Sequence, residues 1–125
     1  MRLRARGEAS AAAVWDRYVH PDRWPEWSPQ IRRVDVPSDR LVTGLTGTVR
    51  GPVGICVRFV IESVDPDAMT WSWRVNPGPL TFRLHHAVRS IAPGSETTLR
   101  IEGAAPLVLA YAPVAQLALV RLVRP

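Results

Sequence analysis

The sequence contains no lysine, so all sixteen of its basic residues are arginines. They outnumber the eleven acidic residues and produce a formal net charge of +5. Binding to nucleic acid or to an anionic membrane surface usually requires such charge on one stripe, whereas these arginines are scattered from Arg2 to Arg124. The charge by itself therefore predicts neither kind of partner.

Cysteine occurs once, at Cys56, which excludes an intrachain disulfide and a cysteine-based zinc site. A single thiol is compatible with a reducing compartment. The basic N-terminal segment is interrupted by Glu8, Ser10 and Asp16 before an apolar stretch long enough for a signal peptide accumulates. We therefore expect a mature, cytoplasmic protein.

Sequence motifs for catalysis, phosphate binding or metal binding are also absent. The sequence has no glycine-rich phosphate loop, no nucleophile elbow and no paired-carboxylate pattern. His85 and His86 are neighbours on a predicted strand and point to opposite faces, while His20 lies in a remote turn, so a three-histidine metal site is not expected. We predict neither a metal nor a cofactor.

The length of 125 residues and the hydrophobic content of 46% are typical of one globular domain, which we place at residues 1–125. Residues 2–8 alternate as in a half-buried strand. Ser10 is a suitable N-cap for an amphipathic helix that extends to about Val19. A proline-rich turn follows over residues 21–29, with room for one short helical turn.

A strand pattern dominates the middle of the chain. Apolar residues occupy every second position in several segments, and short turns of Pro, Gly, Asp and Ser separate them, which predicts an antiparallel meander with one apolar and one polar face. Arginines on the polar face would favour nucleic acid, but sheets that bind RNA carry stacking aromatics on that same face, so we expect no nucleic-acid partner. The predicted strands span residues 31–36, 46–50, 55–62, 69–76, 80–89 and 98–102.

The segment from Gly103 to Val120 is almost entirely apolar. Pro106 suits the first turn of a helix, and Pro113 predicts a kink or the true helix start. A helix over residues 106–124 would be about 28 Å long. The apolar run approaches the length of a membrane span, but its prolines and Gln116 weaken that interpretation. Because the apolar face of the sheet needs a partner, we expect no membrane span and place this helix against the sheet.

Several short motifs stand out within these elements: Val14-Trp15-Asp16, His20 to Pro29 with Trp24-Pro25-Glu26-Trp27, Gly44, Gly47, Trp71-Ser72-Trp73, His86 and Glu102-Gly103. With these motifs, the order of the elements resembles the helix-grip architecture of the START-like, or SRPBCC, superfamily, in particular its polyketide cyclase/dehydrase-like branch. The resemblance implies an α+β fold in which a curved antiparallel sheet of about seven strands wraps around a long C-terminal helix, with a short helical segment after the first strand. It also implies an apolar ligand, such as a polyketide or a lipid, between sheet and helix.

Strand parity places several aromatic rings and one histidine on the apolar face. For any single ring, simple filling of the core explains this equally well, but together with the resemblance the pattern predicts an aromatic-lined cavity. A tight turn can aim only one of Trp24 and Trp27 inward, and we favour Trp27. The predicted ligand-binding residues are Trp27, Ile31, Phe59, Trp71, Trp73, Phe82, His86 and Tyr111.

His86 is the only ionisable side chain that parity places inside, and it is the candidate catalytic residue. Desolvation would keep it neutral, able to anchor a ligand or to move a proton in a cofactor-free polyketide cyclase or aromatase. A core histidine tied to a backbone or tryptophan partner is the commoner situation. Three functions thus stay open: hydrophobic ligand binding, cyclase or aromatase activity, and a structural protein with a filled core. A homodimer would cover the apolar helix.

Overall fold

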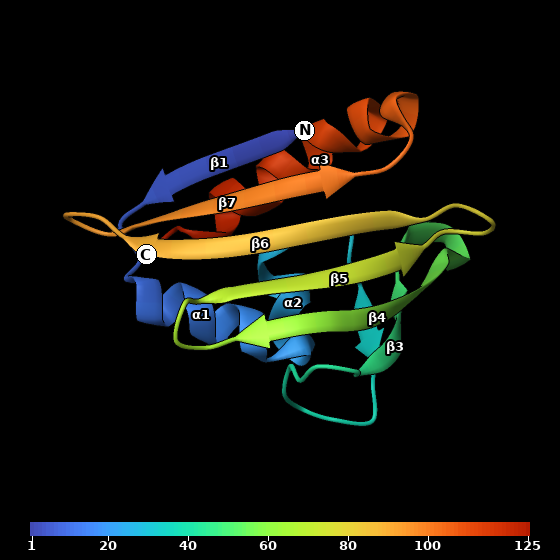
Figure 1. The fold of residues 1–125 in the computed structure, drawn as a ribbon, viewed down its shortest axis with the longest axis horizontal. Helices are drawn as coiled ribbons and strands as arrows, with labels where there is room; N and C mark the ends of the chain where they lie inside the picture. Colours follow the sequence, from blue (N-terminus) through green and yellow to red (C-terminus); the bar gives the residue numbers. More distant parts are fainter.

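The computed structural model describes residues 1–125, which form one seven-stranded antiparallel sheet with helices on one side (Figure 1). The strand order is β1-β7-β6-β5-β4-β3-β2. The strands are β1 (Arg2–Gly7), β2 (Arg33–Asp35), β3 (Thr46–Arg50), β4 (Cys56–Asp65), β5 (Thr70–Asn76), β6 (Phe82–Ser90) and β7 (Ser95–Glu102). The helices are α1 (Ala11–Val19), η1 (Pro21–Arg23), α2 (Trp24–Trp27), η2 (Pro52–Gly54) and α3 (Ala105–Leu122).

This arrangement is the predicted helix-grip fold, with an antiparallel sheet against a long C-terminal helix. Strands β4 to β7 form the predicted meander, and β1 pairs with β7 at the opposite end of the chain. The main difference concerns β7, which begins at Ser95 rather than at residue 98. Its first residues Ser95, Glu96 and Thr97 are polar yet buried, so an apolar alternation could not reveal them.

The first helix begins as predicted, because the Ser10 side chain accepts a hydrogen bond from the backbone N–H of Ala13 at 3.1 Å. The following turn is more helical than expected, with η1 and α2 directly in sequence. The Trp24 indole N–H donates to the backbone carbonyl of Tyr18 at 2.9 Å. This bond folds α2 back against α1 and brings its tryptophans towards the sheet.

Helix α3 runs alongside β1 and β7 (Figure 1) and ends where β1 ends. The backbone N–H of Ala9 donates to the carbonyl of Val123 at 3.2 Å. Gly7 lies so close to this carbonyl that a Cβ at position 7 would overlap it. The two ends of the chain are therefore joined at the rim of the sheet, and this junction sets the position of the C-terminal end of α3.

Only one side of α3 is buried, through Val108, Ala115, Ala118, Leu119 and Leu122. The opposite side is apolar but open to solvent, with Leu109 exposed by 61% and Leu117 by 47%. By length and composition alone the helix could cross a membrane, since its mean hydropathy is 1.6. Its buried residues belong to the core of the domain, as the prediction of packing against the sheet requires.

The proline in α3 does not split it. The helix continues through Pro113, which lacks an amide hydrogen for the carbonyl of Leu109. We expect Pro113→Ala to raise the free energy of unfolding by about 1–3 kcal/mol, because it restores this bond and removes the ring clash. Pro106 lies at the start of the helix, where proline is favourable, so Pro106→Ala should be neutral or slightly destabilising. Urea denaturation of both variants measures this, and equal effects would contradict it.

Candidate functional site

The interior between the sheet and the helices is filled mainly by packed aromatic rings. Trp71 of β5 stacks on Trp24 of α2 with ring centroids 5.5 Å apart, and on His86 of β6 at 4.3 Å. Trp73 and Phe59 extend this cluster along the sheet, with their ring centroids 5.3 Å apart. Strand parity therefore identified the rings correctly as internal, but they occupy most of the space that a large cavity would need.

The expectation that only one of Trp24 and Trp27 points inward is wrong, because both are buried, with exposures of 1% and 7%. They lie three residues apart in a short helix, and residues with that spacing share one face. The sequence predicts a proline-rich turn with room for one short helical turn here, and the longer helical stretch in the structure places both rings on one face. Both tryptophans therefore contribute to the interior, and Trp24 is the more deeply buried.

A small cavity of about 30 Å³ remains between the aromatic cluster and α3. Helix α3 closes it with Tyr111, Ala115, Ala118 and Leu119. Six of the eight predicted ligand-binding residues line it, namely Trp27, Ile31, Trp71, Trp73, His86 and Tyr111. The lining residues that were not predicted are Trp24, Ser28, Gln30, Leu84, Leu99, Ala115, Ala118 and Leu119.

Phe59 and Phe82 do not line this cavity. Phe59 is buried against Trp24 and Trp73 and belongs to the packed core. Phe82 is only partly buried and lies against Gly103, where a Cβ would overlap its ring. Among the unpredicted lining residues, Leu84 lies two residues before His86 on β6, and Leu99 of β7 is paired with His86. Both therefore lie on the same face of the sheet as His86, so the alternation could have identified them.

His86 is held in a buried chain of hydrogen bonds. The Trp73 indole N–H, which can only donate, lies 3.1 Å from Nε2 of His86. Nε2 is therefore an acceptor, and the ring proton is on Nδ1, which donates to the Tyr18 hydroxyl at 3.1 Å. Tyr18 donates in turn to Oγ1 of Thr97 at 2.9 Å, and Thr97 donates to the carbonyl of Ala87 at 3.2 Å.

This network keeps His86 neutral. Burial lowers its pKa from 6.5 to about 3, with a smaller contribution from His85 in the same direction. Burial also raises the pKa of Tyr18 well above its usual value, so the hydroxyl stays protonated. Both ring nitrogens of His86 already have partners in the protein. Of the two alternatives for His86, a catalytic residue or a core histidine with a tryptophan partner, the geometry therefore favours the core histidine.

Three polar side-chain atoms of cavity-lining residues are buried without a hydrogen-bond partner. They are the indole nitrogens of Trp27 and Trp71 and the amide oxygen of Gln30. The amide nitrogen of Gln30 does have a partner, because it donates to the Tyr111 hydroxyl at 3.0 Å. Burial raises the pKa of Tyr111, which is therefore a neutral phenol. The residues that line the cavity are thus mostly apolar, and three of them carry a buried polar atom without a partner, two donors and one acceptor.

The opposite, outer face of the sheet carries many arginines, and carboxylates accompany most of them. Glu96 pairs with Arg6 at 2.6 Å and with Arg89 at 2.9 Å, and these two arginines lower its pKa. Glu62 lies 3.2 Å from Arg83. No group of three or more His, Cys, Asp or Glu side chains has a geometry that could hold a metal ion.

A family model described as "Polyketide cyclase / dehydrase and lipid transport" matches residues 4–124. No curated protein matches the chain. The solved structure of Ara h 8.0201 is similar in fold, with a TM-score of 0.76 at 11% sequence identity over 98% of this chain and 93% of that one. A protein from Chromobacterium violaceum has a TM-score of 0.75 at 13% identity, covering 98% and 94% of the two chains.

A further similar structure is DynU16, a protein of the dynemicin biosynthetic locus. Its TM-score is 0.73 at 14% identity, and the match covers 95% of this chain but 45% of DynU16. At such low identities these structures show that the fold is shared, and they do not transfer a ligand.

The neutral state of His86 has a consequence for stability. Between pH 6.5 and about 3 the unfolded chain takes up a proton at this histidine and the folded chain does not, so acidification favours unfolding. We expect the free energy of unfolding to fall by about 2 kcal/mol more in the parent than in His86→Gln between pH 7 and pH 5. Urea denaturation at a series of pH values measures the difference. Parallel pH profiles would show that folding does not change the pKa of His86.

Proposed function

The chain belongs to the polyketide cyclase/dehydrase and lipid transport family, and from this premise we propose that it binds an apolar small molecule between the sheet and α3. The proposed contacts are the predicted residues that line the cavity, with Trp24 added from the structure. Polyketides and lipids are the ligand classes that this family suggests.

The observation that carries the proposal is the set of unused polar atoms at an otherwise apolar cavity. A buried donor or acceptor without a partner costs about 1–3 kcal/mol. Native proteins tolerate few such groups, and Trp27, Trp71 and Gln30 contribute three of them around one space. A ligand with a hydroxyl or carbonyl group on an apolar skeleton would supply the missing partners. Binding sites for apolar ligands have this composition.

The cavity must widen before such a ligand can enter, because pockets for small molecules usually measure about 300–1,000 Å³. Helix α3 is the element best suited to move. Its first residue is preceded by Ala104, which offers no side-chain cap, and Pro113 removes one of its internal hydrogen bonds. The residues it presents to the cavity include the small side chains of Ala115 and Ala118. A displacement of α3 would therefore open space without disturbing the sheet.

The geometry favours binding over the cyclase or aromatase alternative. A general base must have a free nitrogen or oxygen within hydrogen-bond distance of the proton that it removes. Trp73 and Tyr18 are hydrogen-bonded to the two ring nitrogens of His86. Apart from His86, the only titratable residue that lines the cavity is Tyr111. Catalysis by His86 would first require the ligand to displace one of these bonds.

The proposal is tested with 2-naphthol, an aromatic probe whose hydroxyl can both donate and accept. We expect it to shift the side-chain indole N–H resonances of Trp27 and Trp71 in a proton–nitrogen correlation spectrum. The indole of Trp15, which lies outside the cavity lining, serves as the internal reference. Indole signals of Trp27 and Trp71 that do not move at millimolar 2-naphthol would refute binding at this site.

A substitution at Gln30 separates polar recognition from simple burial. Gln30→Leu removes the unused acceptor, and we expect it to weaken 2-naphthol binding about fivefold, which corresponds to roughly 1 kcal/mol. Gln116→Leu is the matched control, because Gln116 lies on α3 outside the cavity and donates to the carbonyl of Arg4. Titration calorimetry should show an unchanged affinity in the control.

A further inference from the structure

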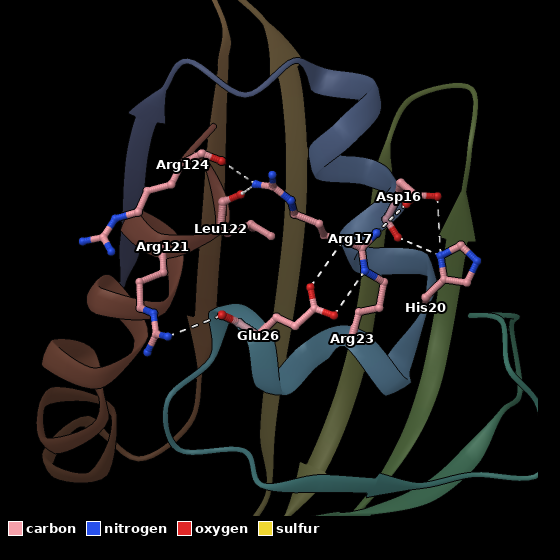
Figure 2. Close-up of polar contacts among 8 residues, drawn as sticks. All are labelled: Asp16, Arg17, His20, Arg23, Glu26, Arg121, Leu122 and Arg124. Atoms are coloured by element: carbon pink, nitrogen blue, oxygen red, sulfur yellow. Dashed lines mark hydrogen bonds and ion pairs between the residues drawn. The ribbon is translucent and has the colours of Figure 1, made fainter.

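A second hollow, which we call the basic cleft, lies where α1 and α2 meet the C-terminal end of α3 (Figure 2). Its volume is about 270 Å³. Glu26, Trp27 and Pro125 line it together with four arginines, and these arginines come from three different segments of the chain: Arg17, Arg23, Arg121 and Arg124. Neither the family match nor the similar structures assign a role to it.

The arginines of the basic cleft differ from those of the outer sheet face in their partners. Arg17 donates to two backbone carbonyls, those of Leu122 at 2.5 Å and Arg124 at 2.7 Å, and so closes the C-terminal end of α3. Arg121 donates to the backbone carbonyl of Glu26 at 3.4 Å. Figure 2 shows the side chain of Arg124 extending away from Arg17, and its guanidinium has no hydrogen bond or ion pair within the chain. These three guanidinium charges have no carboxylate partner.

Three carboxylates act on Arg23, those of Glu26, Asp16 and Asp22. Arg23 pairs with Asp16 at 2.7 Å and with Glu26 at 3.3 Å. His20 lies on the far side of Asp16, which accepts from it through its backbone carbonyl at 2.9 Å. The acidic residues therefore neutralise one of the four arginines, and the basic cleft keeps an excess of positive charge. A concave surface with such an excess attracts and retains oxyanions.

Trp27 belongs to the lining of both the basic cleft and the cavity. Its indole nitrogen is one of the unused donors. One aromatic side chain thus separates an apolar interior from a cationic surface hollow. This juxtaposition fits a molecule with an apolar body and a charged end.

We propose that the basic cleft binds the oxyanion group, a carboxylate or a phosphate, of an amphipathic ligand whose apolar part occupies the cavity. Trp27 turns aside to let the ligand pass between the two spaces. Arg124 and Arg121 contact the oxyanion, and Arg17 holds the end of α3 in place beneath it. This inference rests on the proposed function and specifies its ligand as an anionic amphiphile.

The test compares probes that share a naphthalene ring and differ in charge. In titration calorimetry at low salt, we expect 6-hydroxy-2-naphthoate or 2-naphthyl phosphate to bind at least tenfold more tightly than neutral 2-naphthol. Inorganic phosphate alone should bind more weakly than either amphiphile, because it gains nothing from the cavity. The advantage of the anionic probes should shrink as sodium chloride is added.

Substitutions assign this advantage to the basic cleft. Arg124→Gln should weaken binding of the anionic probe about tenfold and leave binding of 2-naphthol unchanged, and Arg121→Gln should act in the same direction. Arg58→Gln is the matched control, because Arg58 is exposed on the outer face of the sheet and its loss changes the net charge equally. Thermal unfolding of each variant verifies that the fold is intact.

Each other outcome has a distinct meaning. If neither 2-naphthol nor the anionic probes bind, the proposed function fails, and this inference fails with it. Equal affinity for neutral and anionic probes, or equal losses in Arg124→Gln and Arg58→Gln, would overturn the inference and leave the proposed function standing. Inorganic phosphate that bound as tightly as the amphiphiles would also overturn it, because the basic cleft would then act independently of the cavity.

Discussion

The buried hydrogen-bond chain through His86 is the constraint on which the rest of the structure depends. It links β5, β6, α1 and β7 through Trp73, His86, Tyr18 and Thr97. Each donor in it meets one acceptor, so its polar atoms are satisfied without water in a region that excludes solvent. This series of hydrogen bonds therefore sets the distance between α1 and the sheet. It also influences where α2 and α3 lie, because both are hydrogen-bonded to α1.

Two attachments to α1 create the features that we assign to function. The carbonyl of Tyr18 receives the indole N–H of Trp24, which holds α2 against the aromatic cluster. Arg17, one residue earlier, reaches the last carbonyls of α3 and holds that end of the helix. The first attachment leaves the cavity lined by tryptophans, and the second places the basic cleft beside it. Helix α3 is thus anchored at its C-terminal end, whereas its N-terminal end has no side-chain cap.

The alternation of apolar residues was sufficient to predict the sheet, because each strand of the meander buries only one face. It could not reveal Glu96 and Thr97, since their burial depends on Arg6, Arg89 and Tyr18 from distant parts of the chain. The burial of Trp24 departs from the prediction for a local reason, because the segment forms two consecutive helical elements where the sequence predicts a turn with room for one. His86 was identified as internal from parity, but only the positions of Trp73 and Tyr18 show that its nitrogens are occupied. The basic cleft joins segments about a hundred residues apart, so no local pattern could indicate it.

The energetics of the cavity connect its small volume with the proposal that it opens. In the closed state the rings of the aromatic cluster gain contact with one another, while the unused atoms of Trp27, Trp71 and Gln30 each cost about 1–3 kcal/mol. Opening of the cavity breaks part of the contacts among the rings and with α3. A ligand that hydrogen-bonds to these polar atoms restores the lost contacts and also removes the cost of the unpaired atoms. A purely hydrocarbon ligand recovers only the contacts. If the cavity opens as we propose, the closed structure would select ligands by their polar groups before their shape, because only a ligand with such groups offsets the cost of displacing α3.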